Sequence, residues 1–413
     1  MRILVFGEAF LPPAYTPRLR YFCSYFAQKG WNVDLVTEHS PNMGKFIPDG
    51  ISVLSIIYYK NRGGKLSKIE WLLKFLLNLC FDHKGRYFYR KSRPFIDGKQ
   101  YDLVFCNSSI TFPLTTAVAT AKDISAPLFV DLRDIAEQAP TDNPYIAHKA
   151  PKLFGNLIID IYKSVNIVRR NKVLKKAKCV TTVSPWHVKV LSQFNQNTHL
   201  IYNGFDESMF KPELIGLKRF TISYFGQIYN SEMQNPALFF DALRALSKKN
   251  ILTAGNTVVR WFSDKNTREI VQNFAKKQDL EGLMEYYDYI KPEELSDEMN
   301  ASSILLVLRN TPGTKKYLSI MTTKFFEAIG VNRPILCVPD NKDNLTELFN
   351  ETHCGLISSE ASEVEQFLTD QFEKWQQAGH TKGILNEETR MKFSRRKGAE
   401  ILENLFLQEA KSI

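Results

Sequence analysis

Short apolar runs alternate along the chain with longer amphipathic stretches, and this pattern predicts alternating strands and helices. The first run, RILVFG over 2–7, indicates a buried strand, and the stretch over about 18–29 indicates a helix that ends at Gly30. Further strands in this half are predicted over 32–37, 51–57, 102–106, 127–132 and 179–183. Such alternation is typical of parallel strands joined by crossover helices.

The same pattern restarts near residue 220. The run FTISYFG over 220–226 indicates a strand that ends in glycine, and a helix is predicted over about 236–249. Strands are also predicted over 258–263, 284–290, 303–308 and 334–339. Between the halves, IYNGFDESMF (201–210) carries an Asn-Gly turn signal. We therefore expect an α/β protein with two Rossmann-like domains facing across a cleft, where ligands bind at the carboxyl ends of strands.

The 413 residues suit two domains of about 200 residues each. The predicted domains are 1–204 and 205–385, followed by a C-terminal helix over 386–413 that could pack back toward the N-terminal domain. The chain opens directly on a strand, so we expect no signal peptide. No apolar run approaches the roughly 18 residues that a transmembrane helix needs.

Several classes of enzyme lack their usual sequence support. The six cysteines include no C-x-x-C pair and lie mostly in apolar segments, so neither a disulfide scaffold nor a zinc site is expected. The chain contains no H-E-x-x-H, G-x-S-x-G, G-x-x-x-x-G-K-[ST] or G-x-G-x-x-G motif. The sequence therefore does not favour a serine hydrolase, a P-loop enzyme or a dinucleotide oxidoreductase.

The basic excess of the chain belongs to its N-terminal half. Residues 1–204 hold 28 Lys and Arg against 14 Asp and Glu, whereas residues 205–413 hold 26 against 30. Such asymmetry indicates that the N-terminal half faces an anionic surface or substrate.

A helix predicted over 69–81 (IEWLLKFLLNLCF) has polar side chains only at Glu70, Lys74 and Asn78, four residues apart. Cations alternate with aromatic residues just after it, in KGRYFYRKSRPF, and a second basic run covers 169–178. We expect residues 65–95 and 169–178 to meet an anionic membrane surface. The alternative is a buried crossover helix with a solvated basic loop. We recognise no nucleic-acid-binding module, so no nucleic-acid partner is expected.

A carboxylate stands inside an apolar segment, MTTKFFEAIGVNRPIL over 321–336. We predict a short helix that Thr322 or Thr323 caps and Gly330 ends, with a buried strand after it. Glu327 of this helix must either face solvent or have a polar partner, because an unpaired buried carboxylate is costly.

Five stretches, in order, resemble the family 4-type retaining glycosyltransferases of the two-domain GT-B fold, in particular their lipid- and polysaccharide-directed members. They are FLPPAYTPRLRYFCSYFAQKGWNVDLVT, VDLRDIAEQAP, VTTVSPWHVKVLSQF with HLIYNGFD, SYFGQIYN and TTKFFEAIGVNRPIL. Together they extend over nearly the whole chain. The resemblance implies an N-terminal acceptor-side domain with a basic, membrane-facing patch and a C-terminal nucleotide-sugar donor domain.

The resemblance also implies a donor site around Glu327. Its carboxylate would accept hydrogen bonds from the ribose hydroxyls of the donor. The helix N-terminus at Thr322 and Thr323, together with Lys324, would face the diphosphate. Four other candidate donor contacts come from two further loops: Gly226, Gln227, Arg309 and Lys316.

On the acceptor side, we expect Asp134 to orient the acceptor hydroxyl near the reacting centre. Arg133 stands where many family members have His, and the alternative is an Arg133–Asp134 pair that only holds a loop. Glu8, Pro17 and Arg18 are further candidates for contacts with the acceptor or a phosphate.

This chain departs from the family pattern in the donor domain. Many members have Arg after the glycine at 226 and Lys a few residues later, where this chain has Gln227 and Glu232-Met233-Gln234. Ser319 replaces the first Glu of the E-x7-E motif, and SDKN over 263–266 replaces a glycine-rich turn.

We therefore expect a metal-independent, hexosyltransferase-type glycosyltransferase that acts with retention and needs no cofactor. Its nucleotide-sugar donor would serve a lipid-linked or polysaccharide acceptor in the assembly of bacterial surface glycans such as lipopolysaccharide. It would be cytoplasmic and peripheral at the inner face of the membrane. The alternatives are a nucleotide-sugar epimerase on the same fold and a non-catalytic glycosyltransferase-like binding subunit.

Overall fold

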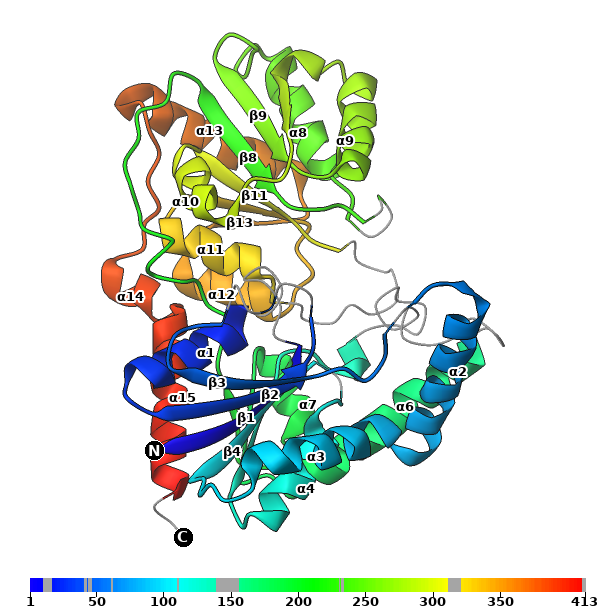
Figure 1. Ribbon diagram of the computed structural model, residues 1–413. Helices are drawn as coiled ribbons and strands as arrows, with labels where there is room; N and C mark the ends of the chain where they lie inside the picture. The colour runs from blue at the N-terminus through cyan, green and yellow to red at the C-terminus, as the bar shows by residue number, and fades with distance from the viewer. Residues whose placement is uncertain are drawn as a thin grey trace. The chain divides into compact units, whose positions relative to one another are not determined.

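The computed structural model describes residues 1–9, 17–40, 43, 47–60, 62–109, 111–138, 156–229, 231, 234–310 and 321–410 (Figure 1). Contacts divide the chain into an N-terminal unit, Met1–Tyr202 with Gly398–Ile413, and a C-terminal unit, Asn203–Lys397. We describe each unit by itself.

The N-terminal unit contains a parallel sheet of seven strands in the order β3-β2-β1-β4-β5-β6-β7. The strands are β1 (Arg2–Ala9), β2 (Asn32–Glu38), β3 (Ile51–Ile56), β4 (Leu103–Ser108), β5 (Leu128–Leu132), β6 (Cys179–Thr182) and β7 (Thr198–Leu200). The strand order reverses between β1 and β4, and ligands of doubly wound sheets bind beyond the strand ends at such a point.

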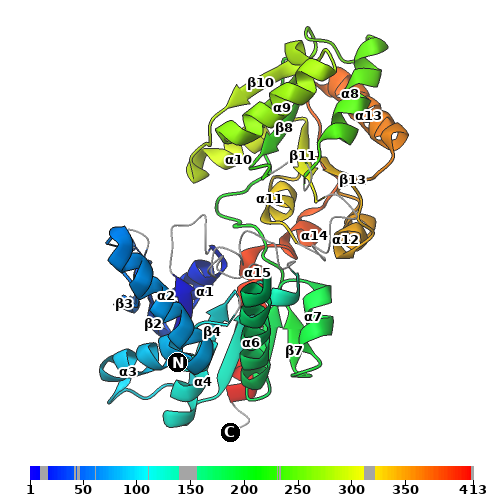
Figure 2. The ribbon, with the colours of Figure 1, turned by 90° about the vertical axis from the view of Figure 1, so that its right-hand side faces the viewer.

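Helices cover this sheet and form two apolar clusters with it. They are α1 (Pro17–Gln28), α2 (Gly64–Phe81), α3 (His83–Ile96), α4 (Leu114–Asp123), the short η2 (Ala136–Gln138), α6 (Asn156–Leu174), α7 (Pro185–Leu191) and most of α15 (Arg395–Ala410). Helix α15, labelled in Figure 2, is the last helix of the chain. The ring of its Phe406 packs against Phe26, Phe105 and Phe129. Residues at the two ends of the chain therefore share one core.

The C-terminal unit repeats the arrangement with a six-stranded parallel sheet in the order β10-β9-β8-β11-β12-β13. Its strands are β8 (Phe220–Phe225), β9 (Thr257–Phe262), β10 (Met284–Tyr287), β11 (Ile304–Leu308), β12 (Ile335–Val338) and β13 (Gly355–Ile357). Its helices are α8 (Ala237–Lys248), α9 (Lys265–Lys277), the short η3 (Glu281–Leu283), α10 (Pro292–Asn300), α11 (Thr323–Val331), α12 (Asn344–Thr352), α13 (Ala361–Ala378) and α14 (Glu387–Met391).

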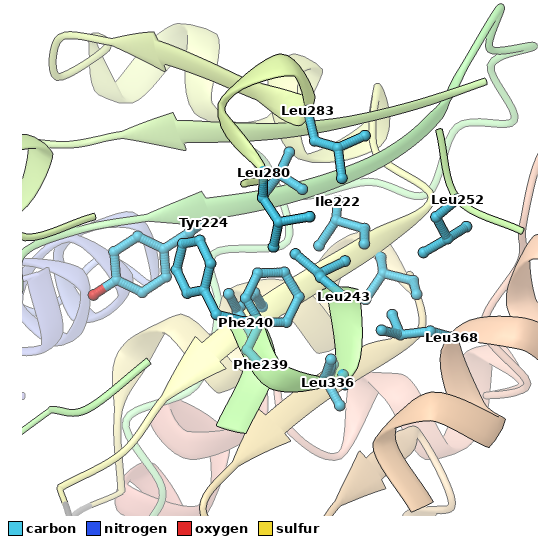
Figure 3. Close-up of a cluster of buried hydrophobic side chains, with 14 of the residues drawn as sticks. Ile222, Tyr224, Phe239, Phe240, Leu243, Leu252, Leu280, Leu283, Leu336 and Leu368 are labelled. Atoms are coloured by element: carbon cyan, nitrogen blue, oxygen red, sulfur yellow. The ribbon is translucent and has the colours of Figure 1, made fainter. Parts of the chain in front are cut away.

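The core of this unit lies where α8 and α13 pack on the sheet (Figure 3). Phe240 of α8 stacks on Trp261 of β9, and the ring of Tyr224 packs beside the same indole. Tyr224 thus has its ring in the core, while its hydroxyl extends away from the cluster (Figure 3).

The structure confirms the predicted α/β class and every strand predicted in both halves. It adds β7 and β13, which are only three residues long and carry too short a pattern to be recognised. The prediction that Gly330 ends its helix is wrong, because α11 continues to Val331 and Asn332 takes the left-handed conformation (φ 51°). Gly330 is instead buried, and a Cβ there would lie 2.7 Å from that of Phe210. Close packing, not chain reversal, requires this glycine.

Among the residues that the structure describes, no helix is long and apolar enough to cross a membrane.

Candidate functional site

The strongest candidate site of the C-terminal unit lies where β8 ends, beside the reversal of strand order between β8 and β11. Gly226 follows β8 with φ +140°, and the side chain of Lys324, from the first turn of α11, lies directly against it. A Cβ at position 226 would be 2.0 Å from Lys324 Nζ. The glycine therefore allows an ammonium group to approach the backbone at the strand end.

Lys324 is held over an aromatic ring. Its Nζ lies 4.8 Å from the centroid of the Tyr224 ring and donates to the Tyr224 hydroxyl oxygen over 3.3 Å. The Tyr224 hydroxyl in turn donates to the backbone carbonyl of Gln227 over 3.1 Å. Burial lowers the pKa of Lys324 to about 8, although Glu327 opposes this shift. An anion that bound here would be attracted to an ammonium group that has few partners.

Glu327 follows Lys324 by three residues on α11, so the two side chains lie on the same side of the helix. Burial raises the pKa of the Glu327 carboxyl, while Arg395 and Lys324 act in the opposite direction. Within the described part of the chain, no hydrogen bond or ion pair reaches this carboxylate. We expected this charge either to face solvent or to have a polar partner; the structure instead leaves its side chain half-buried. A half-buried carboxylate of this kind is suited to accept hydrogen bonds from a ligand.

The N-terminus of α11 adds a second attraction for anions. Thr322 is the N-cap residue, but no side chain of the described residues caps the helix. The uncapped N–H groups of the first turn, at Thr323 and Lys324, carry the positive end of the helix dipole. Backbone donors and an ammonium group therefore occur together at one end of α11.

The side chain of Gln227 is already engaged. Its amide donates to Asp264 over 2.9 Å, and Asp264 also caps α9 by accepting from the backbone N–H of Thr267. Gln227, which stands where many of the glycosyltransferases that the sequence resembles have Arg, thus ties the loop after β8 to α9.

Arg309 lies at the end of β11, buried, and donates to Asp343 over 2.5 Å. Its other terminal nitrogen, Nη1, is buried without a partner among the described residues. Arg309 is therefore only partly satisfied at the strand next to β8. Lys316, the other predicted cation of this loop, lies outside the described residues.

The N-terminal unit places two predicted residues at its own strand ends. Glu8, at the end of β1, accepts from the hydroxyl and the backbone N–H of Ser109, just past the end of β4, so this pair spans the point where strand order reverses. Asp134 is exposed, and its Oδ2 lies 3.7 Å from Arg133 Nε. The Arg133–Asp134 pair that we considered as an alternative is therefore present.

Arg18 is buried in a network at the centre of the sheet. Its Nε and Nη2 donate to Asp131 over 3.0 and 2.8 Å, and its Nη1 donates to the carbonyl of Tyr202 over 2.7 Å. Asn107 and Thr181 also donate to Asp131. Burial raises the pKa of Asp131, but Arg18 and these donors together hold it below its usual range. This geometry favours a structural role for Arg18 over the predicted contact with an acceptor. Pro17 is the first residue of α1, a position that suits proline.

The second basic run, 169–178, is partly committed to structure. Arg169 donates to the carbonyls of Asn78 and Leu79 at the C-terminus of α2, both over 2.8 Å. Arg170 is buried and donates through two nitrogens to Glu137. Only the lysines of this run are exposed, so it offers less charge to a partner than the sequence suggested.

Two members of the candidate site were not predicted from the sequence. The sequence pattern around Tyr224 indicates only a buried strand, and Arg395 lies 68 residues after Glu327 in a segment without a recognised motif. No group of three or more His, Cys, Asp or Glu side chains within the described ranges could hold a metal ion.

No protein-family model matches the chain, and no curated protein matches it. Solved structures do match it over its whole length. Sucrose-phosphate synthase from Thermosynechococcus elongatus matches with 14% identity and a TM-score of 0.61, covering 100% of each chain. Anabaena Alr3699/HepE in complex with UDP-glucose matches with 14% identity and a TM-score of 0.58, covering 100% of this chain and 99% of that chain. A candidate UDP-N-acetylglucosamine 2-epimerase from Listeria monocytogenes matches with 10% identity and a TM-score of 0.55, covering 100% and 97%.

At these identities the similarity establishes the fold. The chain has the GT-B fold, with two Rossmann-like units that each contain a doubly wound parallel sheet. The prediction of this fold is confirmed.

Proposed function

We propose that this protein is a glycosyltransferase that moves a sugar from a nucleotide-sugar donor to a lipid-linked or polysaccharide acceptor. The observation that carries the proposal is the arrangement of Gly226, Lys324 and Glu327 at the end of β8. A solved structure of the same fold, Alr3699/HepE, contains UDP-glucose, which supports a donor of this class.

Each group of the site matches one part of such a donor. The Glu327 carboxylate can accept from two vicinal ribose hydroxyls at once, and these bonds would relieve the cost of its burial. Lys324 and the N-terminus of α11 can bind the diphosphate, which gains charge as the glycosidic bond breaks. The main catalytic work of the donor unit is then electrostatic stabilisation of the leaving nucleotide.

The missing family cation after Gly226 makes Lys324 more important in this chain. Gln227 is neutral and bonded to Asp264, so it supplies no charge to a phosphate. Arg309 is buried beside the strand end with one nitrogen unsatisfied among the described residues, and we assign it a supporting contact. We further propose transfer with retention and without a metal ion or cofactor.

For the acceptor side, we propose that Asp134 orients the acceptor hydroxyl and that Arg133 and Glu8 contribute nearby charge. The basic excess of residues 1–204 supports an anionic membrane surface as the location of the acceptor. The protein would then act in the cytoplasm as a peripheral protein at the inner face of the membrane, in the assembly of surface glycans such as lipopolysaccharide.

Two alternatives have specific support. The similarity to a candidate epimerase favours a reaction that needs no acceptor, and conversion of a nucleotide-sugar alone would identify it. The substitutions at Gln227 and Ser319 favour a non-catalytic binding subunit. Nucleotide binding without turnover on any acceptor would identify that subunit.

The test is thermal stabilisation of the purified protein by UDP, GDP, TDP, ADP and CMP. We expect one of them to raise the melting temperature, and Glu327→Ala to remove most of that shift. Glu351→Ala, an exposed position on α12, is the matched control and should keep the shift. If no nucleotide stabilises the protein, or Glu327→Ala responds like the wild type, the donor site is not at Glu327.

A further inference from the structure

The outward side of α2 is apolar and exposed. Leu66, Ile69, Leu73, Leu76 and Leu77 are 84%, 55%, 56%, 43% and 41% exposed, and they follow one another at helical spacing. Cys80 continues the same side and is also exposed. Scattered exposed leucines need no explanation, but a continuous row of them along one helix indicates a binding surface.

The polar stripe of α2 is directed toward the protein. Lys74 lies 2.8 Å from Glu70 and donates to the backbone carbonyl of Tyr58 over 2.6 Å. The side-chain oxygen of Asn78 accepts from the backbone N–H of Lys84. Lys74 and Asn78 are therefore used for internal contacts, while the apolar row remains outside, whereas a surface helix of a soluble protein usually turns its apolar side chains inward.

Helix α6 packs against the Phe75 side of α2 and leaves the apolar row of α2 uncovered. Phe75 is one of two buried residues of α2, and it packs against Ile159 and Tyr162 of α6. Arg169 of α6 caps the C-terminus of α2 through two carbonyls. Both contacts fix the orientation of α2, so the exposure of its apolar row follows from the packing of the N-terminal unit.

Exposed cations lie on the same helix as this row and on the helix that follows it. Lys65 and Lys68 are exposed on α2, and Arg86, Arg90 and Lys91 are exposed on α3, which follows at once. No ion pair of the described residues involves these five side chains. Pairing this face with the same face of a second copy would bring like charges together, which disfavours self-association. The charge is complementary to anionic lipid headgroups instead.

We propose that α2 lies in the plane of an anionic bilayer and inserts its leucine row at the boundary between headgroups and acyl chains. Helix α2 has 18 residues, so roughly 27 Å of helix can lie along the surface. The proposal goes beyond charge attraction, because it assigns much of the binding to apolar insertion. It rests on the proposed function only in naming a lipid-linked acceptor as the reason for membrane contact.

The native chain offers a reporter of insertion. Of the six cysteines, Cys80 alone is exposed, so an environment-sensitive fluorophore can be attached to it in the otherwise unchanged protein. Vesicles of phosphatidylglycerol and phosphatidylcholine in equal parts should shift the emission of this label to the blue. A lipid-borne quencher near the headgroups should reduce the emission. A label that stays fully hydrated while the protein binds vesicles overturns the proposal.

Substitutions in the row test the apolar contribution. We expect Leu73→Glu with Leu77→Glu to lower partitioning into these vesicles by about tenfold or more. Leu214→Glu, at a 58% exposed position of the C-terminal unit, is the matched control and should change partitioning less than about twofold. In about 1 M NaCl, where the Debye length is roughly 3 Å, the wild type should keep measurable binding. Complete loss of binding in high salt, or wild-type partitioning of the double variant, overturns insertion.

Two further measurements separate this proposal from its rivals. Light scattering should show the same molar mass for the wild type and the double variant; a dimer that the double substitution dissociates would assign the row to a second copy and overturn the proposal. Thermal stabilisation by the nucleotide should be unchanged in the double variant, because the donor site belongs to the other unit. Failure of insertion with a normal nucleotide shift would therefore leave the proposed function intact.

Discussion

Replacement of Lys324 by Met tests the electrostatics of the candidate site directly. The substitution keeps an unbranched side chain of similar length over Tyr224 and removes the charge. Burial lowers the pKa of Lys324 from 10.5 to about 8, which means that the folded protein without ligand holds this charge at a cost. Removal of the charge should therefore raise the stability of the ligand-free protein at pH 7.

The size of the effect follows from the shift. At 1.36 kcal/mol per pKa unit, the change from 10.5 to about 8 sets an upper bound of about 3 kcal/mol. The side chain is only half-buried, and Met also loses the attraction between Lys324 and Glu327. We therefore expect Lys324→Met to gain about 1–2 kcal/mol in the free energy of unfolding.

The change of stability with pH provides a second, independent test of the same charge. Between pH 8 and 10.5 the unfolded chain keeps the Lys324 proton while the folded protein releases it, so the contribution of this group to stability rises with pH in that window. Lys324→Met should lack this rise. The affinity for the stabilising nucleotide should fall by about tenfold or more, because a charge-assisted contact is lost.

Urea denaturation at pH 7, 8, 9 and 10, with calorimetric titration of the nucleotide at pH 7, measures these effects. Lys374→Met, at an exposed position of α13, is the matched control and should leave both quantities nearly unchanged. A loss of stability in Lys324→Met, or an unaltered rise above pH 8, would refute the electrostatic account of the site.

Three further predictions concern other groups. Burial raises the pKa of Glu327, so nucleotide affinity should fall as the pH drops through that pKa. Glu327→Gln should lack this loss of affinity at acid pH. If calorimetry shows the same loss in the wild type and in the variant, the role of the carboxylate is contradicted. Gly226→Ala should lower the free energy of unfolding, measured in urea, by about 1–3 kcal/mol and should also weaken nucleotide binding. Gly379→Ala, also at positive φ but in open space, should affect stability alone. Asp131→Asn should lower the free energy of unfolding by about 3–5 kcal/mol, because it leaves the buried Arg18 guanidinium without its counter-charge. Asp134→Asn, in an exposed pair, should lower it by less than about 1 kcal/mol. Comparable urea midpoints for the two variants would disprove the structural role of the buried pair.

Local sequence determined the secondary structure and the class of fold. Buried strands of a parallel sheet appear as continuous apolar runs, since both faces are covered, and the regular spacing of these runs indicated two doubly wound units. Local pattern also identified the helix that carries Lys324 and Glu327, because a Thr-Thr pair precedes an apolar helical stretch there. The edge strands β7 and β13 were missed because they are only three residues long. The end of α11 was misplaced because tertiary packing around Gly330 overrides the usual preference of glycine for helix ends.

The tertiary structure decided which side chains meet. Tyr224 and Lys324 are 100 residues apart, and Arg18 and Asp131 are 113 residues apart, so no local pattern could have paired them. The apolar spacing of α2 was visible in the sequence, but a helical pattern has the same appearance whether its leucines face a core or the surface. Lys74 contacts Tyr58, Phe75 packs on α6, and Arg169 of α6 donates to the carbonyl of Asn78; these contacts orient the helix and leave its apolar row outside. Sequence periodicity thus determined which residues share a face, and only long-range packing determined what each face contacts.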